Sequence, residues 1–215
     1  MAINKKLVLA VSSDGDNITV EDCTNFLAAR DKKALANFIY DRLYGRYLKP
    51  FDYPEEDYRK NYKNGFSLMA SCCLLIETYI SFTNSKYRNT TNKGRECFGY
   101  FLTSENKFVE LAAGGLQANG DISTPKQGGL PNDFYSNVRC GILHNAETKN
   151  GWVITRSDKK PYFNPTTKEI NAAKFANRLK SVLSRYRNNL IKADFDTDDI
   201  WVNFKNRLTD LINNS

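Results

Sequence analysis

Residues 65–83 read GFSLMASCCLLIETYISFT, and this stretch decides the fold. Apolar residues cover almost every side of a helix built from it, which is typical of a helix surrounded by protein. One narrow face is different, and its members are mostly small: Ser67, Ala70, Cys73, Glu77 and Ser81. Small side chains let a neighbouring helix come close. Glu77 is the only acid of the stretch, and a buried acid at this position needs a cation as its partner.

Amphipathic segments on both sides of this helix predict further helices. Asp31 is placed to cap a helix that ends before Pro50, with Leu35, Phe38, Ile39 and Leu43 inward and Arg42 on another side. The other helices are expected over Cys97–Val109, Phe134–Asn150 and Ala172–Ile191, and after the acidic turn Asp194–Asp199.

Three short segments read as β structure. Lys6–Val11 and Ile18–Val20 flank an Asp-Gly pair and suggest a hairpin near the N-terminus. Trp152–Arg156 and Pro161–Phe163 suggest a second small hairpin, which Thr167–Ile170 would extend. The sequence thus predicts a mainly α protein: a helical bundle with a small β-hairpin and a short N-terminal β-like segment. We expect one domain over 1–215, with an N-terminal extension (1–30), a core (31–192) and a C-terminal helix (193–215).

The charge is strongly basic and unevenly distributed. The chain carries a formal net charge of +7, and residues 139–192 contain 12 Lys and Arg against the three acids Glu147, Asp158 and Glu169. This bias suits a polyanion such as RNA, although a solvated helix face gives the same count. The candidate RNA-binding residues in this region are Lys159, Lys160, Arg178 and Arg185.

The cysteine and histidine content argues against a metal centre or a disulfide framework. There are five cysteines with no C-x2-C pair, and a single histidine cannot build a histidine-rich zinc site. The run Leu7–Val11 is too short for the core of a signal peptide, and Leu68–Ile76 is too short for a membrane span. We therefore expect a soluble, reduced, cytoplasmic protein without a metal or another cofactor.

That histidine lies in residues 134–152, which read FYSNVRCGILHNAETKNGW. A helix with a stop at Gly151 would place Tyr135, Val138, Ile142 and Ala146 in one apolar stripe. Arg139 falls at the edge of this stripe and His144 nearly opposite it, so His144 must face water, another helix or another subunit. Arg139 is the expected partner of Glu77. The pair Arg139–His144 is equally compatible with a purely structural role.

The motif R-x4-H near the end of a bundle helix, after an apolar helix with one acid, resembles the signature of the HEPN superfamily (higher eukaryotes and prokaryotes nucleotide-binding). The resemblance covers about residues 31–192. It implies a metal-independent RNA endonuclease in which two copies of Arg139 and His144 meet in the cleft of a homodimer. Tyr135 and Asn145 would help to orient RNA, and Glu77 would support Arg139. A toxin or phage-defence setting, with an antitoxin or another protein partner, is implied in the same way.

Three alternatives remain open from the sequence. Many HEPN proteins have a polar residue directly after the arginine, whereas this chain has Cys140, which favours a non-catalytic module that binds a nucleotide, RNA or a protein. Cys140 and His144 also have the spacing of a thiolate–imidazolium pair, without an evident oxyanion hole. The chain could finally be a helical scaffold in which Arg139 and His144 are a coincidence.

Overall fold

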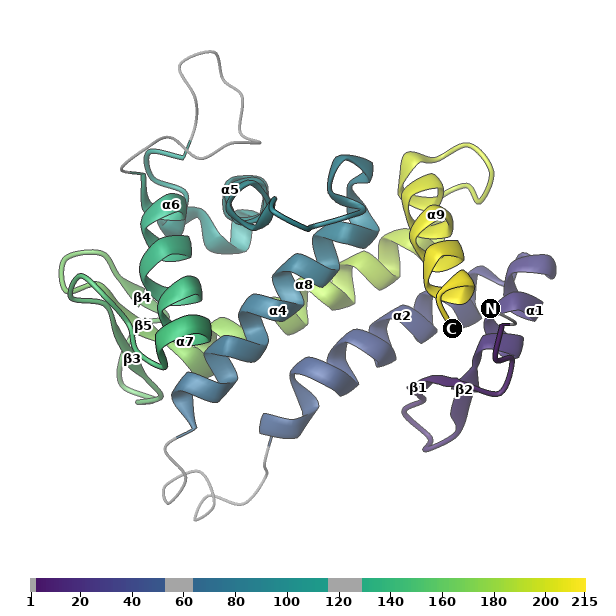
Figure 1. The fold of residues 1–215 in the computed structure, drawn as a ribbon, viewed down its shortest axis with the longest axis horizontal. Helices are drawn as coiled ribbons and strands as arrows, with labels where there is room; N and C mark the ends of the chain where they lie inside the picture. The colour runs from purple at the N-terminus through teal and green to yellow at the C-terminus, as the bar shows by residue number, and fades with distance from the viewer. Residues whose placement is uncertain (1–2, 53–63, 116–128) are drawn as a thin grey trace.

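The computed structural model describes residues 3–52, 64–115 and 129–215, and it is mainly α, as predicted. The α-helices are α1 (Val20–Ala28), α2 (Lys32–Tyr47), α4 (Gly65–Thr83), α5 (Gly94–Ser104), α6 (Leu130–Phe134), α7 (Cys140–Asn145), α8 (Ala172–Lys192) and α9 (Asp199–Asn213). The shorter helical turns are η1 (Lys49–Phe51), η2 (Ser85–Tyr87), η3 (Asn106–Leu111) and η4 (Tyr135–Arg139). The strands are β1 (Val8–Val11), β2 (Asn17–Thr19), β3 (Val153–Thr155), β4 (Phe163–Asn164) and β5 (Glu169–Asn171). Figure 1 shows their arrangement.

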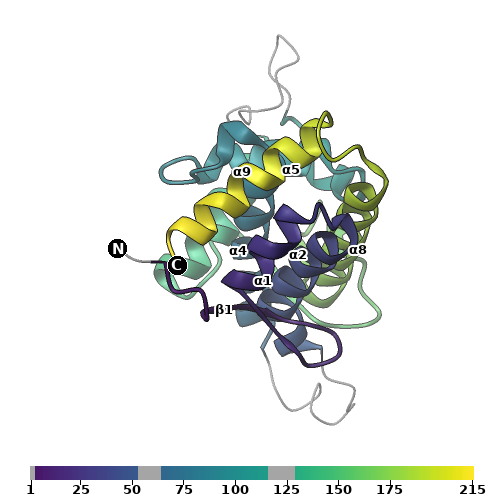
Figure 2. The same cartoon turned by 90° about the vertical axis from the view of Figure 1, so that its right-hand side faces the viewer.

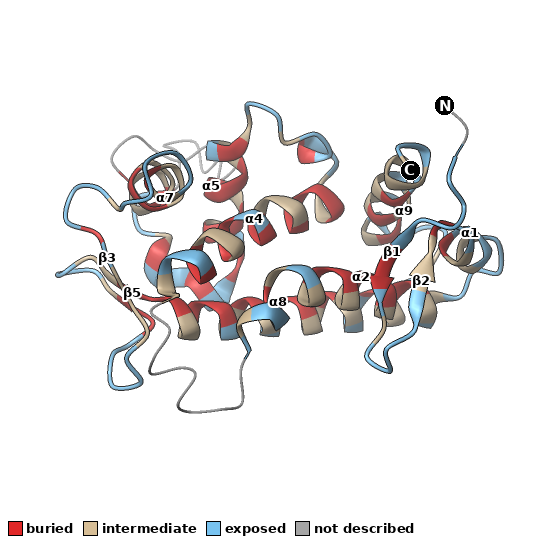
Figure 3. Cartoon of the chain, turned by 60° about the horizontal axis from the view of Figure 1, so that its bottom comes forward, coloured by how far each residue is buried: buried red, intermediate tan, exposed pale blue. Residues whose placement is uncertain are grey.

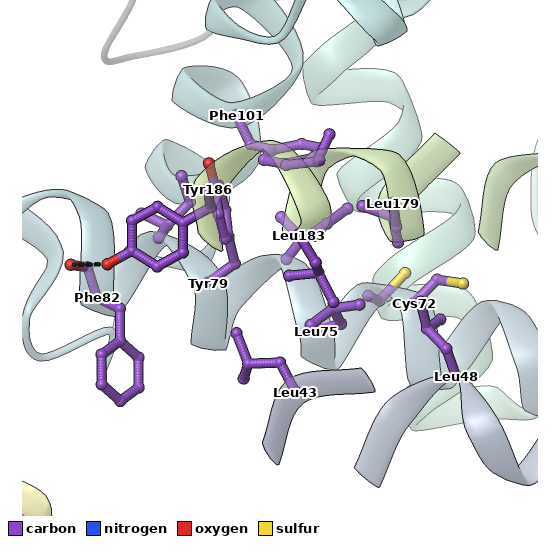
Figure 4. Close-up of a cluster of buried hydrophobic side chains, with 14 of the residues drawn as sticks. Leu43, Leu48, Cys72, Leu75, Tyr79, Phe82, Phe101, Leu179, Leu183 and Tyr186 are labelled. Atoms are coloured by element: carbon purple, nitrogen blue, oxygen red, sulfur yellow. Dashed lines mark hydrogen bonds between the residues drawn. The ribbon is translucent and has the colours of Figure 1, made fainter. Parts of the chain in front are cut away.

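Helix α4 is the central element, and its bounds are those predicted from the sequence. It packs against α2, α5, α8 and α9, and buried residues line these helices where they face one another (Figure 3). In the core, Leu75 and Tyr79 of α4 meet Leu183 and Tyr186 of α8, and the Tyr186 hydroxyl donates to the Phe82 carbonyl at 3.3 Å (Figure 4). Within the described parts of the chain, α4 is the one helix long and apolar enough to cross a membrane, and more than half of it is buried. Its apolar character matches its place inside the protein.

The narrow face of small residues on α4 takes closely packed neighbours, as its small side chains predicted. Cys73 is fully buried and Ser81 is nearly so, because α7 and α9 pack on this side. Phe66 and Leu74, which belong to the apolar residues expected to be buried, are 39% and 42% exposed. The prediction that α4 is surrounded by protein on almost every side is therefore wrong at these two residues.

The N-terminal segment contains the predicted hairpin and an unpredicted helix. Strands β1 and β2 pair antiparallel through a turn with Gly15 at φ +94°. Helix α1 follows directly, with Thr19 and Asp22 forming a reciprocal capping box. The extension 1–30 is thus not only β-like, and Val20 and Cys23 belong to the core.

Helix α2 begins at the predicted cap, because the Asp31 side chain accepts a hydrogen bond from the Ala34 amide. Its inward residues are as predicted, but Arg42 is buried rather than solvated. The Arg42 guanidinium donates to the Leu9 carbonyl, which also accepts from Arg46 at 3.0 Å. These bonds fasten the β1–β2 hairpin to α2, a long-range contact that helical periodicity cannot indicate.

The second β region is a three-stranded sheet in the order β3-β5-β4. β4 and β5 form an antiparallel pair, and β3 pairs with β5 in parallel. The predicted hairpin between Trp152–Arg156 and Pro161–Phe163 is therefore wrong, since β5 lies between these two strands. The predicted helix Cys97–Val109 is also corrected, because α5 starts at Gly94 and gives way to the turn η3 after Ser104.

Helices α8 and α9 have nearly the predicted bounds, and α9 brings Trp201, Phe204 and Leu208 into the core. The two ends of the chain meet beside α9, where the Asn4 amide donates to the Ser215 carbonyl at 3.0 Å (Figure 2). The C-terminal helix is thereby packed on the same core as residues 31–192.

Candidate functional site

The segment that carries Arg139 and His144 is helical from Leu130 to Asn145, in three parts. Pro131 lies in the first turn of α6, where its missing N–H is not needed. The Cys140 amide then bonds to the Tyr135 carbonyl, five residues back, so that η4 is a π-helical turn between α6 and α7. Single π turns of this kind are frequent at functional sites. The prediction of one regular helix from Phe134 was thus wrong at its start and in its middle.

The helix also ends six residues before the predicted stop at Gly151. Ala146 takes the left-handed conformation with φ +55°, its amide bonds to Ile142, and the Glu147 amide bonds to the Gly141 carbonyl at 3.4 Å. The bond from the Ala146 amide to Ile142 is that of an αL motif, and the Glu147 bond brings the chain back over the last helical turn. Gly141 permits it, because a Cβ atom there would lie 2.5 Å from the Glu147 carbonyl oxygen. Ala146 is exposed and does not belong to the apolar stripe, whereas Val138 is fully buried.

A polar network holds the returning chain against the helix. The Asn137 amide group donates to Asp133, and the Asn137 side-chain oxygen accepts from Asn150 at 2.8 Å. The other oxygen of Asp133 accepts from the Trp152 indole at 3.1 Å and from Lys168 at 3.0 Å. The backbone that follows His144 is therefore fixed at several points.

Arg139 and Glu77 form the predicted ion pair between the π turn and α4. Both Nε and Nη2 of Arg139 lie 2.9 Å from Glu77 Oε1, and the two side chains are only 16% and 15% exposed. Burial alone would lower the pKa of Arg139, but the hydrogen bond and charge of Glu77 outweigh it and raise the pKa. Glu77 thus keeps this arginine charged and fixes its orientation.

The third nitrogen of Arg139 is directed toward His144. Arg139 Nη1 lies 3.5 Å from His144 Nε2, and His144 is exposed, as predicted from its position opposite the apolar stripe. A guanidinium can only donate, so a hydrogen bond between the two groups would use His144 Nε2 as the acceptor. The distance is long for a hydrogen bond, and the His144 side chain is exposed, so a substrate can reach its ring.

Tyr135, Cys140 and Asn145 surround this pair. The Arg139 guanidinium carbon lies 5.4 Å from the centre of the Tyr135 ring. Burial raises the pKa of Tyr135, the neighbouring Cys140 thiol adds to this shift, and Arg139 opposes it, so the phenol remains a hydrogen-bond donor at neutral pH. Cys140 is half-buried, and Asn145 is exposed beside His144 at the end of α7.

Two adjoining pockets open beside the ion pair. The first has a volume of about 570 Å³ and is lined by polar residues of α4, α5, η4 and the loop before α5: Glu77, Thr90, Thr91, Asn92, Gly94, Arg95, Tyr135 and Arg139. The second, of about 590 Å³, shares Glu77 and Thr90 with the first and includes Lys86, Arg88, Lys93 and Arg207. We call them the arginine pocket and the lysine pocket.

Sequence reasoning did not assign the residues of the 84–95 segment to the site. The only signal was the basic character of the stretch (Lys86, Arg88, Lys93 and Arg95), which reads equally well as a solvated loop. Among the described residues, no group of three or more His, Cys, Asp or Glu side chains is placed to hold a metal ion.

The four candidate RNA-binding residues from the basic C-terminal half do not line either pocket. Lys160 pairs with Glu169 at 3.0 Å, Arg178 with Glu110 at 3.3 Å, and Arg185 with Glu105. Lys159 is exposed in the turn before β4. The structure therefore brings together Glu77, Tyr135, Arg139, His144 and Asn145, and leaves these four elsewhere.

No protein-family model, curated protein or solved structure matches this chain. What the site does must therefore be inferred from its own residues.

Proposed function

We propose that this protein is a metal-independent RNA endonuclease of the HEPN type, which acts as a homodimer in the cytoplasm. The observation that carries the proposal is the line of three side chains Glu77, Arg139 and His144. A nearly buried carboxylate holds a charged arginine, and the arginine directs its remaining nitrogen toward the only histidine of the chain. Arg139 and His144 are the proposed catalytic residues, and Glu77 is a positioning residue.

Arg139 supplies the charge that phosphoryl chemistry needs. When the 2′-oxygen of RNA attacks the adjacent phosphorus, negative charge grows on the non-bridging oxygens. A guanidinium whose orientation is set in advance stabilises this charge without having to reorganise. Because Glu77 binds Nε and Nη2, Nη1 is the nitrogen available for phosphate.

The reaction also needs two proton transfers. His144 Nε2 takes the proton of the 2′-hydroxyl as the bond from O2′ to phosphorus forms. The bond from phosphorus to the 5′-oxygen breaks, and this oxygen receives a proton from the partner's His144, which is protonated at that stage. The products are a 2′,3′-cyclic phosphate and a 5′-hydroxyl, and solvent exchange returns both histidines to their starting states. DNA lacks the 2′-hydroxyl and is not a substrate.

Two features support a dimeric arrangement. His144 and Asn145 are exposed at the end of α7, as residues that meet a second subunit would be in the isolated chain. Leu143 on α7 and Leu74 on α4 are 36% and 42% exposed, and these two helices lie side by side. Large apolar side chains exposed around a functional residue are a common property of subunit interfaces.

The decisive experiment is cleavage of a mixed RNA pool by the purified protein in EDTA. We expect cyclic-phosphate ends, and a loss of about 100-fold or more in rate for His144→Ala and for Arg139→Ala. Arg187→Ala is a matched control outside both pockets, and we expect it to cut normally. Cleavage that survives both substitutions would show that the active site lies elsewhere.

A non-catalytic binding module is the second candidate. The specific observation in its favour is Cys140, a half-buried thiol beside Tyr135 and Arg139, at the position where HEPN nucleases often have a polar side chain. A folded, dimeric wild-type protein that binds RNA without cutting it would favour this candidate. The toxin or phage-defence setting, with a second protein that restrains the dimer, belongs to the nuclease proposal.

A further inference from the structure

Arg95 differs from the other arginines around it and on α8 that form ion pairs at the surface. Arg88, Arg178 and Arg185 each pair with a carboxylate. Arg95 is exposed, and within the described ranges no acid pairs with it. Its contacts are the Ser136 hydroxyl at 3.3 Å and the Tyr135 ring, whose centre lies 5.3 Å from the guanidinium carbon. Its charge is therefore available to a ligand.

Tyr135 places Arg95 and Arg139 at the same pocket, although they belong to different elements. The ring lies 5.4 Å from the Arg139 guanidinium carbon and 5.3 Å from that of Arg95. It also lies directly on the start of α5, since a Cβ atom on Gly94 would be 2.7 Å from the Tyr135 hydroxyl oxygen. One aromatic ring thus sets the relative position of two guanidinium groups.

The surroundings of the two arginines suit a phosphodiester chain. The arginine and lysine pockets together are lined by six cations, Lys86, Arg88, Lys93, Arg95, Arg139 and Arg207, against two acids, Glu77 and Asp210. Hydroxyl and amide groups of Thr90, Thr91 and Asn92 complete the wall of the arginine pocket. Helix α5 starts there without a side-chain cap, so its first amides add positive potential. A pocket of about 570 Å³ has the size of a small-ligand site and accepts an unpaired nucleotide rather than a duplex.

We propose that Arg95 is a second phosphate-binding residue of the site and that it holds a phosphate next to the one at which the chain is cut. Unpaired RNA then runs from Arg139 past Arg95 toward Lys93 and Arg207 in the lysine pocket. This inference rests on the proposed function, because it names the path of the substrate through the same site. Arg95 positions the strand and takes no part in the proton transfers.

The test compares Arg95→Gln, Arg95→Lys and wild type. Arg178→Gln is the matched control, because Arg178 also stacks on a tyrosine, Tyr162, but is paired with Glu110 outside the two pockets. Binding is measured with a fluorescent, fully 2′-O-methylated RNA, which cannot be cut, over a series of salt concentrations. Cleavage of the corresponding natural RNA gives KM and kcat separately.

We expect Arg95→Gln to weaken binding about tenfold, the loss of one charged hydrogen-bond contact. The slope of log Kd against log salt should fall by about 0.7 for the phosphate contact that is lost. KM should rise while kcat stays within about threefold. The reason is that Arg95 would bind the RNA equally well in the ground state and in the transition state. Arg95→Lys should retain most of the salt slope, and Arg178→Gln should behave as wild type.

The possible failures can be told apart. If His144→Ala abolishes cleavage but Arg95→Gln and Arg178→Gln have the same Kd, salt slope and KM, the role of Arg95 is refuted and the nuclease proposal stands. If the wild type binds the methylated RNA in an Arg95-dependent way but never cuts natural RNA, Arg95 keeps its role and the nuclease proposal fails. If the wild type binds no RNA, both proposals fail.

Discussion

At the scale of single residues, Glu77 acts on Arg139 through both charge and geometry. Glu77→Gln keeps the shape and one acceptor oxygen but removes the charge that compensates a nearly buried guanidinium. We expect the free energy of unfolding to fall by about 1–3 kcal/mol, since a mostly buried guanidinium loses the charge that compensates its own. Chemical denaturation of the variant measures this loss.

Glu96→Gln is the control for this substitution. Glu96 pairs with Lys86 at 3.6 Å on the surface, with side chains 34% and 51% exposed, and exposed pairs contribute little. We expect a change below about 0.5 kcal/mol. Equal effects of the two substitutions would mean that Glu77 does not hold Arg139 as the structure indicates.

At the scale of the element, the end of α7 depends on two small residues, and we expect substitutions at them to change stability in opposite directions. Ala146 occupies the left-handed position of an αL motif, where glycine is preferred, and Gly141 lies under the returning chain. We expect Ala146→Gly to stabilise the protein by about 1 kcal/mol and Gly141→Ala to destabilise it by about 1–3 kcal/mol. Thermal unfolding of both variants shows whether each substitution raises or lowers stability. If Gly141→Ala stabilised the protein, the chain could not lie as close to Gly141 as the structure indicates.

At the scale of the whole molecule, the proposed site is complete only when two chains meet around α7. Leu143→Glu places a charge beside His144 on the surface that the second chain would cover. We expect sedimentation velocity to show a shift from dimer to monomer, together with a loss of about 100-fold or more in cleavage, because one histidine cannot serve both proton transfers.

Val202→Glu is the matched control for the dimer. Val202 is 40% exposed on α9 and lines neither pocket, and α9 is separated from α7 along the long axis of the molecule (Figure 1). This variant should remain dimeric and active. A Leu143→Glu variant that stays dimeric and cuts RNA would place the subunit interface on another surface.

The sequence by itself determined those helices whose signals lie within their own residues. The helices α2, α8 and α9 follow from apolar periodicity and from signals at their ends, such as the Asp31 cap and the acidic turn before α9, and α4 follows from its almost wholly apolar sequence. The partnership of Glu77 and Arg139 could also be predicted, because a single acid in an apolar helix requires a cation if the helix is buried. The exposure of His144 followed from its angle to the apolar stripe.

Only the tertiary structure decided the features that depend on distant partners. The π turn at Tyr135–Arg139 and the early end of α7 depend on what the segment packs against, and β3 pairs with β5 rather than with its neighbour in sequence. Arg42 and Arg95 show the same limit, since one arginine is buried by a hairpin 33 residues away and the other is left exposed at a pocket. The sequence cannot tell which arginine is buried and which is exposed, because the free energy of a charged side chain depends on the groups that the fold places around it.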